Sequence, residues 1–349
     1  MGFVPRVQES VPLAPLSTLG VGGPARWYLH AEDVDAVRFG LTWAAEHRLP
    51  LFVLGGGSNV VFADAGFDGL VLHLALRGRA IGADGTVQAA AGESWDPLVE
   101  AAVEHGLAGL ECLSGIPGLV GATPIQNVGA YGQDVSETIT RVHALDARSG
   151  APVVFTGAEC GFGYRDSLFK SRAPGRYVVL AATYRLVPGG PPYLGYADIA
   201  REIGSASPPL AAVRETVIRV RRSKSMVLDP GDPNARSCGS FFLNPIVDGA
   251  ALAAIDARAA GLSMPRWAQP DGRVKLSAAW LIERAGFTRG QSEGPVGLST
   301  RHTLAIVCHD GARARDVTAF ARRVRAGVEE RFGVRLHPEP IFWGALSLD

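Results

Sequence analysis

The sequence predicts an α+β fold with mixed sheets, divided into two or three domains. Its 349 residues exceed the length of one typical domain. Short apolar, strand-like runs alternate with segments of helical periodicity in the first part of the chain, and the last third carries several helical segments of its own. With 47% hydrophobic and 19% charged residues, the chain can bury a sizeable core.

Periodicity and local signals locate the elements. Apolar residues at helical spacing predict a helix over 33–47. Asp96 followed by Pro97 predicts the start of another helix, with Asp96 at the N-cap and Pro97 at the first helical position. Further helices are predicted at 209–222, 250–260, 276–285 and 313–332. Strands are predicted at 51–54, 70–74, 87–91, 141–145, 152–155, 177–186 and 304–307.

Charge and hydropathy exclude several classes of protein. Lys+Arg and Asp+Glu are both 34, so the formal charge is zero and we expect no nucleic-acid partner. The local basic cluster 221–224 could still meet phosphates. No apolar run reaches the roughly 20 residues that span a bilayer, and residues 1–10 lack the features of a secretion signal. We expect a cytoplasmic monomer without membrane insertion.

The cysteines and histidines predict neither disulfides nor a metal site. The four cysteines are far apart and form no C-x-x-C pair, so we expect reduced core thiols. They are Cys112, Cys160, Cys238 and Cys308. The eight histidines show no metal-ligand spacing, and the adjacent pair Cys308 and His309 is too little for zinc.

The first glycine-rich motif, LGGGSN at residues 54–59, directly follows a predicted strand. Glycines let successive backbone N–H groups turn toward an anion, and Ser58 and Asn59 add side-chain donors. The apolar residues after Asn59 do not open a helix, so a Rossmann fold is disfavoured. Taken alone, the motif predicts either a phosphate-binding loop or a flexible turn.

A second glycine-rich motif, GIPGLVGATPIQNVGAYG, occupies residues 115–132. Five glycines and two prolines in an apolar context imply backbone that lies against a flat or extended ligand. Two such motifs can hold the two ends of a dinucleotide, and together they predict an FAD site. The predicted FAD contacts are Leu54, Gly55, Gly56, Gly57, Ser58, Asn59, Gly115, Ile116, Pro117, Gly118, Gly121, Ala122, Gln126, Asn127, Gly129, Ala130, Tyr131 and Gly132.

Further motifs follow one another along nearly the whole chain. They are LSTLGVGG at 16–23, FGYRDSLFK at 162–170, GSFFLNP at 239–245, KLSAAWLIE at 275–283 and HPEP at 337–340. With the two glycine-rich motifs, they make the chain resemble the UDP-N-acetylenolpyruvoylglucosamine reductases, the MurB family. Several long motifs in the family's order are more specific than either glycine-rich motif alone.

The resemblance implies an FAD-binding fold of the PCMH or vanillyl-alcohol-oxidase type, made of two subdomains, with a C-terminal α+β substrate-binding domain. The implied division is subdomain 1 at 1–78 joined by the tail 340–349, subdomain 2 at 79–222 with a substrate loop at 190–200, and the substrate-binding domain at 223–339. FAD is implied to be non-covalent, with NADPH as co-substrate. The implied reaction reduces an enolpyruvyl ether of UDP-N-acetylglucosamine to UDP-N-acetylmuramate, a peptidoglycan precursor.

The same resemblance gives three residues catalytic roles. Hydride addition to the vinyl carbon develops negative charge on the substrate carboxylate, and a cation beside a hydrogen-bonding group stabilises this enolate. Arg165 is the implied cation because its guanidinium presents a rigid fork to a carboxylate, and Glu339 is the implied second group. Ser240 is the implied proton donor. Without the resemblance, an Arg165–Asp166 pair, a solvent-facing glutamate and a turn serine are the simpler interpretations.

Other positions match substrate contacts of the family. They are Tyr164, Tyr196, Lys224, Asn244 and His302. Lys224 can neutralise a diphosphate, and tyrosines stack or donate hydrogen bonds. Residues 193–199 resemble the substrate-closing loop of the family's longer, type I class. Some relatives carry cysteine in place of Ser240, so we assign the nearby Cys238 to packing.

Two other functions remain open from the sequence. An FAD-dependent oxidase of the same fold often tethers the flavin through histidine or cysteine near the glycine motif, and LGGGSN contains neither. A non-catalytic flavin-binding or nucleotide-sugar-binding module would not need Arg165, Ser240 and Glu339 together. Both observations favour the reductase.

Overall fold

The computed structural model describes residues 6–348, and the chain divides into two compact units. The first comprises the residues up to Val11, Ala25–Gly57 and Asp68–Leu228. The second comprises Pro12–Pro24, Ser58–Phe67 and the residues from Asp229 onward. Each contains both helices and sheets, so the predicted α+β class is confirmed.

The first unit is built on two sheets. The four-stranded sheet has the order β1 (Gln8–Pro12), β2 (Pro24–Ala31), β5 (Phe67–Leu74), β3 (Leu51–Leu54). The five-stranded antiparallel sheet has the order β12 (Pro152–Thr156), β11 (Ile139–Asp146), β13 (Tyr177–Arg185), β7 (Thr86–Ala90), β6 (Arg79–Ile81). Its longer helices are α1 (Val34–Glu46), α2 (Trp95–Glu104), α4 (Ala197–Ile203) and α5 (Leu210–Ser223).

Short elements connect these sheets and helices. They are β8 (Leu107–Ala108) paired with β14 (Val187–Pro188), β9 (Gly129–Ala130) paired with β10 (Gln133–Asp134), η2 (Glu111–Leu113), η3 (Val120–Ala122), α3 (Thr123–Gln126), η4 (Val135–Glu137) and η5 (Leu168–Arg172). The second glycine-rich motif runs through η3, α3 and β9, which are all elements of two to four residues.

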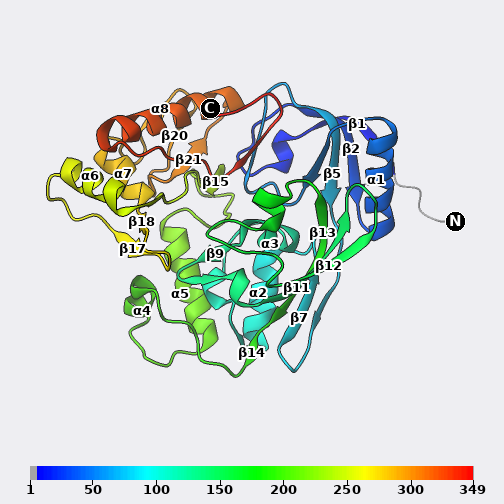
Figure 1. Ribbon diagram of the computed structural model, residues 1–349, viewed down its shortest axis with the longest axis horizontal. Coiled ribbons are helices and arrows are strands. Elements are labelled where there is room, and N and C mark those ends of the chain that lie inside the picture. Colours follow the sequence, from blue (N-terminus) through cyan, green and yellow to red (C-terminus); the bar gives the residue numbers. More distant parts are fainter. Residues whose placement is uncertain (1–5, 349) are drawn as a thin grey trace. The chain divides into compact units, whose positions relative to one another are not determined.

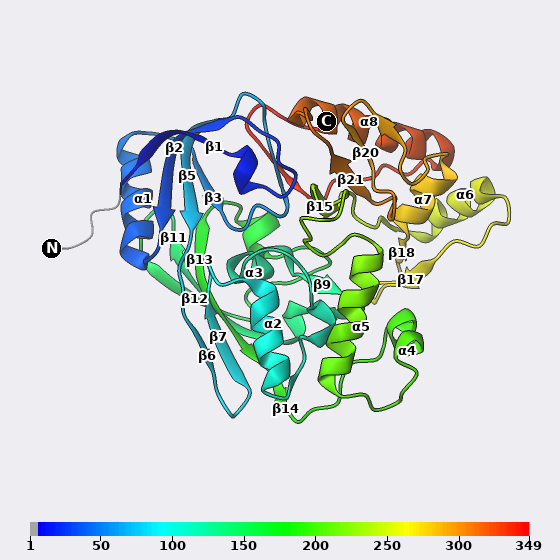
Figure 2. The same ribbon diagram turned by 180° about the vertical axis from the view of Figure 1, so that it is seen from behind.

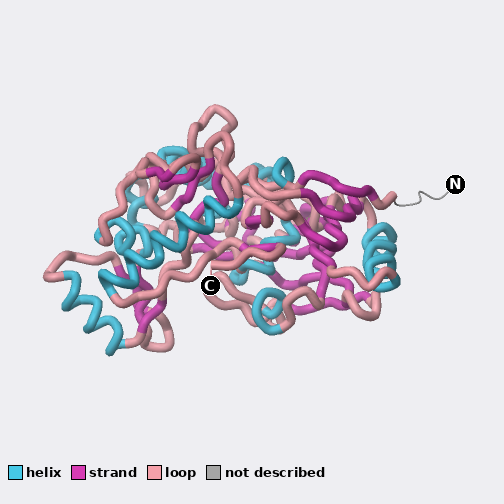
Figure 3. Tube along the Cα trace, turned by 90° about the horizontal axis from the view of Figure 1, so that it is seen from above, coloured by secondary structure: helices cyan, strands magenta, loops and turns pink. Residues whose placement is uncertain are grey.

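Each sheet of the first unit is covered by an amphipathic helix. Asp33 caps α1 by accepting a hydrogen bond from the Ala36 N–H at 2.7 Å, and the apolar side of α1 packs on β2 and β5. Figure 3 shows α1 as a helix beside these strands. Helix α2 packs on the five-stranded sheet through Trp95, Leu98 and Val99 (Figure 2). The helix predicted over 33–47 is confirmed.

The second unit has its own core. Its four-stranded antiparallel sheet has the order β15 (Ser237–Ser240), β21 (Ala305–Cys308), β20 (Val296–Leu298), β19 (Ser292–Glu293). Helices α6 (Gly249–Ala259), α7 (Ala278–Arg284) and α8 (Ala314–Phe332), drawn in yellow to red in Figure 1, carry its apolar core with β20 and β21. The remaining elements are η1 (Ala14–Leu16), β16 (Ile246–Val247), β17 (Arg266–Ala268), β18 (Val274–Leu276), β4 (Val60–Phe62) and β22 (Ile341–Trp343).

Two predicted helix starts are wrong by two residues. Helix α7 begins at Ala278 because Leu276 belongs to β18 and the Ser277 side chain caps the helix, accepting from the Trp280 N–H at 3.2 Å. Helix α2 begins at Trp95 with Ser94 at the N-cap, so Asp96 lies inside the first turn. Asp96 cannot cap this helix, because its carboxylate is bonded elsewhere. The four cysteines are free and buried, as predicted.

His73 on β5 links the four-stranded sheet to LGGGSN. Its Nδ1 lies 2.6 Å from the hydroxyl of Tyr28, and its ring is hydrogen-bonded to the backbone of Gly55. The ring centroid of His30 lies 5.2 Å away. Burial and repulsion from His30 and Arg77 lower the pKa of His73 from 6.5 to about 4, and the Gly55 hydrogen bond opposes this shift in part.

We expect His73 to lower the free energy of unfolding by about 2 kcal/mol between pH 7.5 and pH 5. Below pH 6.5 the unfolded chain binds a proton at this ring while the folded chain stays neutral until about pH 4, so stability falls as the pH falls. Urea unfolding at both pH values should show a smaller loss for His73→Asn. The exposed His309, changed to asparagine, should retain the wild-type loss. Equal losses in all three proteins would contradict the prediction.

Candidate active site

The structure packs the two glycine-rich motifs against each other within the first unit. A Cβ added to Gly56 would lie 3.1 Å from the Cα of Gly118, closer than side chains normally approach a backbone. Gly118 has φ +116°, a conformation that favours glycine. The glycines are therefore required by close backbone packing as well as by turn geometry.

A pocket of about 390 Å³ opens beside this packing. Its walls come from Gly56, the first turn of α2, residues 115–119, Val227 and Leu228. This volume lies within the 300–1,000 Å³ that is typical of ligand sites. Residues of both predicted FAD motifs thus line one hollow, which suits part of a dinucleotide.

Gln126 tests whether these residues fit a bound cofactor. It is 8% exposed, and neither its Nε2 nor its Oε1 has a hydrogen-bond partner among residues 6–348. Buried amides in proteins are almost always satisfied, since an unmade hydrogen bond costs about 1–3 kcal/mol. A polar ligand such as the flavin ring, which offers both donors and acceptors, would satisfy both ends of this amide.

Changing Gln126 to methionine should have opposite effects on the apoprotein and on cofactor binding. The apoprotein should be as stable as wild type or more stable, because an unsatisfied amide is replaced by an apolar chain of similar size. FAD affinity should fall about tenfold or more. Gln133 is the matched control, since it is also buried but donates to Glu111 and accepts from the Cys112 N–H. Gln133→Met should lower apoprotein stability. Unfolding of the apoproteins would measure the change in stability, and titration with FAD would measure the change in affinity. Unchanged FAD affinity in Gln126→Met would contradict the assignment of Gln126 to the FAD site.

Arg165 lies against the second glycine-rich motif. Its Nη1 donates to the carbonyl of Asn127 at 3.2 Å, and its Nη2 donates to the carbonyl of Gly129. The ring of Tyr164 lies 5.6 Å from its guanidinium carbon. Asp166, the alternative partner considered from the sequence, accepts a hydrogen bond from Ser171 at 3.0 Å. The first unit therefore holds the predicted cation beside the predicted FAD motif.

The second unit brings together Asn59, the segment after β15, and Glu339. The Glu339 N–H donates to the carbonyl of Phe241 at 2.9 Å, and the Glu339 carbonyl accepts from the Asn59 side chain at 3.3 Å. Ser240 immediately precedes Phe241 and pairs with Ala305 of β21. Two predicted catalytic residues, Ser240 and Glu339, thus lie on neighbouring segments, next to the end of LGGGSN.

A β-bulge separates the environments of Ser240 and Cys238. Ser237 pairs with Val307 and Ser240 with Ala305, so β15 has one residue more than its partner between these pairs. Gly239 supplies the irregular backbone with φ +74°. Cys238 is buried in the core of the second unit, and burial raises the pKa of its thiol. This burial agrees with the assignment of Cys238 to packing.

The substrate residues predicted from the resemblance fall into separate places. Tyr196 stands at the start of α4, and its ring meets that of Tyr131 edge to face at 5.2 Å. The Nζ of Lys224 lies 6.0 Å from the Tyr131 ring. In the second unit, the Asn244 side chain accepts from the Ala278 N–H at 2.9 Å. His302 accepts a backbone hydrogen bond from Ala305 at 3.1 Å.

Sequence reasoning missed the roles of two arginines on α5. Arg214 is 8% exposed and pairs with Asp96. Arg221 has a buried Nε and donates through Nη2 to the carbonyl of Met226 at 2.6 Å. The spacing of seven residues places both arginines on one side of a predicted helix, and Val213 and Val217 are its buried residues. That spacing is the signal that could have identified them.

Comparison with known proteins identifies the family. Residues 25–156 match the FAD binding domain, and residues 232–343 match the C-terminal domain of UDP-N-acetylenolpyruvoylglucosamine reductase. The UDP-N-acetylenolpyruvoylglucosamine reductase of Streptomyces coelicolor is 50% identical over 97% of this chain and 91% of its own length. That of Thermobifida fusca is 47% identical over 96% of this chain and 98% of its own. The chain belongs to the UDP-N-acetylenolpyruvoylglucosamine reductase family.

The structure agrees with this membership. The crystal structure of the UDP-N-acetylenolpyruvylglucosamine reductase (MurB) from Thermus caldophilus superposes with a TM-score of 0.69 at 27% identity, covering 98% of this chain and 100% of that one. The predicted FAD-binding fold with a C-terminal α+β domain is therefore confirmed, and FAD is the cofactor of this reductase. No helix in the described part of the chain is long and apolar enough to cross a membrane.

Proposed function

We propose that this reductase converts UDP-N-acetyl-3-O-(1-carboxyvinyl)-glucosamine to UDP-N-acetylmuramate with NADPH, in the synthesis of peptidoglycan precursors. The main support for this proposal is the sequence of the chain, which is 50% identical to a UDP-N-acetylenolpyruvoylglucosamine reductase over 97% of its length. A bound FAD would supply the hydride-transfer chemistry between NADPH and the substrate. The protein must hold the substrate, stabilise the charge that develops on it, and deliver a proton.

Arg165 is proposed to stabilise the developing enolate by pairing with the substrate carboxylate. Its contacts with the carbonyls of Asn127 and Gly129 support this role, because they hold the guanidinium in a defined orientation before substrate binds. Preorganised groups of this kind usually supply the largest share of catalysis.

Glu339 and Ser240 are proposed to complete the reaction. The backbone of Glu339 is held on one side by Phe241 and on the other by Asn59, so its carboxyl is carried by a fixed segment. In its protonated form, Glu339 donates a hydrogen bond that helps to stabilise the enolate. Ser240 delivers the proton to the carbon next to the carboxylate, a transfer that a positioned group accelerates typically by about 10²–10⁴.

We further propose that the chain belongs to the longer, type I class and that its substrate loop includes residues 193–199. This segment is anchored: the Tyr193 N–H donates to the buried Glu111 carboxylate at 2.8 Å, and Ile199 is fully buried. Tyr196, together with Tyr164, Lys224, Asn244 and His302, is proposed to contact the nucleotide sugar. The edge-to-face contact between Tyr196 and Tyr131 supports a link between the substrate loop and the second glycine-rich motif.

The domain division of the proposal is subdomain 1 at 1–78 with the tail 340–349, subdomain 2 at 79–222, and the substrate-binding domain at 223–339. Strand β4 lies within residues 1–78 of this division but belongs to the second compact unit, and its parallel pairing with β22 supports joining the tail to that part of the chain. A cytoplasmic location is supported by four free, buried cysteines. The proposed monomer can be checked by light scattering.

An anaerobic two-step experiment tests the function. The purified protein should be yellow, NADPH should bleach the flavin, and the enolpyruvyl nucleotide sugar should restore the oxidised spectrum without oxygen. The competing oxidase predicts that only oxygen restores the spectrum. Reoxidation by oxygen alone, or a colourless protein that takes up no added FAD, would refute the proposed reaction.

A further inference from the structure

Residues 115–119, here called the glycine wall, are attached to the first turn of α2. The Trp95 N–H donates to the Gly118 carbonyl at 3.0 Å. Just after the glycine wall, the Val120 N–H donates to the carbonyl of Glu93, which precedes the N-cap of α2, at 2.9 Å. The Trp95 indole Nε1 donates to the Leu113 carbonyl at 3.1 Å. These contacts make the position of the glycine wall depend on the position of the first turn of α2.

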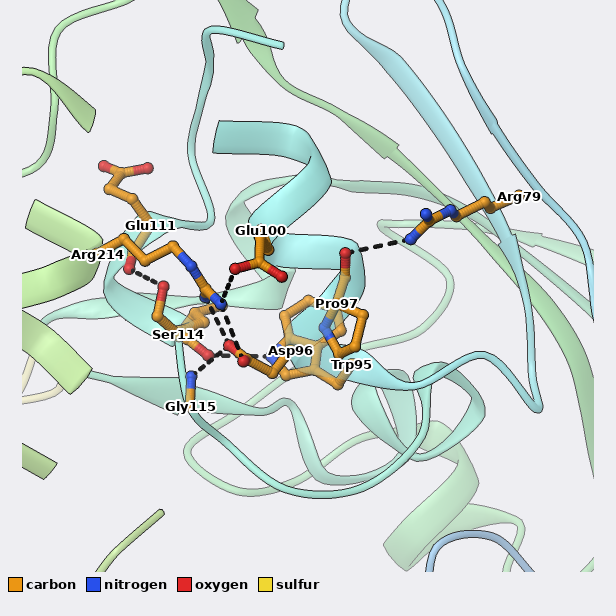
Figure 4. Close-up of polar contacts among 10 residues, drawn as sticks. Arg79, Trp95, Asp96, Pro97, Glu100, Glu111, Ser114, Gly115 and Arg214 are labelled. Atoms are coloured by element: carbon orange, nitrogen blue, oxygen red, sulfur yellow. Dashed lines mark hydrogen bonds and ion pairs between the residues drawn. The ribbon is translucent and has the colours of Figure 1, made fainter. Parts of the chain in front are cut away.

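Asp96 makes the most direct of these attachments. Its Oδ1 accepts from the Gly115 N–H at 2.6 Å and also from Nη1 of Arg214 at 2.6 Å, while its Oδ2 accepts from Nη2 of Arg214 at 3.0 Å (Figure 4). The Arg214 side chain is 9% exposed. A two-pronged contact of this kind fixes the plane of the carboxylate, and with it the direction in which Gly115 is held.

Both groups of the pair remain charged in the fold. Burial raises the pKa of Asp96, but hydrogen bonds from Arg214 and Gly115 outweigh burial and hold this pKa below its ordinary value. Burial lowers the pKa of Arg214, but the interactions with Asp96 and Glu100 outweigh burial and raise this pKa above its ordinary value. Glu100 is the second partner of Arg214, at 3.2 Å, with a side chain that is 54% exposed. Of these two carboxylates, Asp96 is the one that bonds Gly115.

Helix α5 approaches the glycine wall at a second point. A Cβ added to Gly115 would lie 3.4 Å from Nε of Arg221 and 3.2 Å from the Val227 side chain. Gly115 itself has φ +71°, a conformation that favours glycine, so a larger residue here would be strained as well as crowded. Helix α5 therefore acts on Gly115 in two ways. Its Arg214 holds the Asp96 carboxylate that bonds Gly115, and its Arg221 lies close to the Gly115 Cα.

We propose that Arg214 is a positioning residue for FAD: by orienting Asp96, it fixes Gly115 and the glycine wall in the form that binds the cofactor. The inference rests on the proposed assignment of the glycine-rich motifs to FAD. Arg214 itself lines no part of the pocket, whereas Asp96 and Gly115 do. Its effect on FAD must therefore pass through Asp96.

A double-mutant cycle on full-length protein tests this. Arg214→Lys keeps the charge and loses the two-pronged contact, and Asp96→Asn weakens both bonds of the carboxylate. Each should raise the FAD dissociation constant about 10- to 100-fold and change the visible circular dichroism of bound flavin. The double variant should bind FAD no more weakly than the weaker single variant, because both act on one contact. Glu100→Gln removes the other partner of Arg214 and should change the dissociation constant less than about twofold.

Unfolding of each apoprotein, followed in parallel, separates positioning from general stability. Three results would overturn the inference. The first is that the effects of Arg214→Lys and Asp96→Asn on FAD affinity add in the double variant. The second is that Glu100→Gln weakens FAD binding as much as these variants do, and the third is that folded Arg214→Lys and Asp96→Asn bind FAD as tightly as wild type. If the wild-type protein bound no FAD, both the proposed function and the inference about Arg214 would fail. If wild type and all variants bound FAD equally well, the positioning role of Arg214 alone would fail.

Discussion

Replacing Ser240 by alanine is expected to slow reduction of the enolpyruvyl sugar by about 10²–10⁴ while leaving reduction of the flavin by NADPH within a few-fold of wild type. The substitution removes the proposed proton donor and a single oxygen atom, so the fold and the cofactor should persist. Stopped-flow measurement of the two half-reactions separates the effects. Equal loss in both half-reactions would mean that Ser240 has a structural role.

Cys238→Ala is the matched control for Ser240. Both residues lie on β15, but Cys238 packs in the core with Cys308, and its raised pKa keeps it as a thiol. We expect Cys238→Ala to lower the free energy of unfolding by about 1 kcal/mol and to leave both half-reactions nearly unchanged. A selective loss of the second half-reaction in Cys238→Ala would transfer the proton-donor role to the thiol.

Replacing Arg165 by methionine is expected to lower kcat/KM for the enolpyruvyl sugar by about 10²–10³, with most of the loss in kcat. The guanidinium is proposed to meet charge that develops in the transition state, and methionine offers neither charge nor donors. Methionine also loses the contacts with the carbonyls of Asn127 and Gly129, so FAD content must be measured in the same preparation. A rise in KM with unchanged kcat would show that Arg165 only binds the substrate.

Arg172→Met controls for the loss of an arginine that donates to backbone carbonyls. Arg172 belongs to the same stretch of chain and donates to the carbonyls of Cys160 and Gly161 at 3.4 Å and 3.0 Å. It matches no predicted site position. We expect its substitution to affect stability modestly and kcat/KM less than about threefold. A loss as large as that of Arg165→Met would attribute the effect to the local fold.

Local signals in the sequence were sufficient for the longer helices, but they predicted fewer than half of the strands in the described chain. The caps and apolar faces of α1 and α8 are encoded within each segment, so their predicted bounds agree with the structure to within a residue. Asp96 shows where such signals fail. Aspartate before proline is typical of a helix start, yet the helix begins at Trp95, two residues before the predicted Pro97. The Asp96 carboxylate is used instead by Arg214, 118 residues further along the chain.

The order of the motifs and the two glycine-rich segments determined the family, the cofactor and the reaction class, because these depend on residue types at short spacing. The tertiary structure decided which groups meet. It placed Gly56 against Gly118, Arg165 against the carbonyls of the second motif, and Glu339 beside the segment that follows Ser240. It also left the Gln126 amide buried and unpaired within the described chain. Contacts between residues far apart in sequence depend on how the elements pack, which no local pattern records.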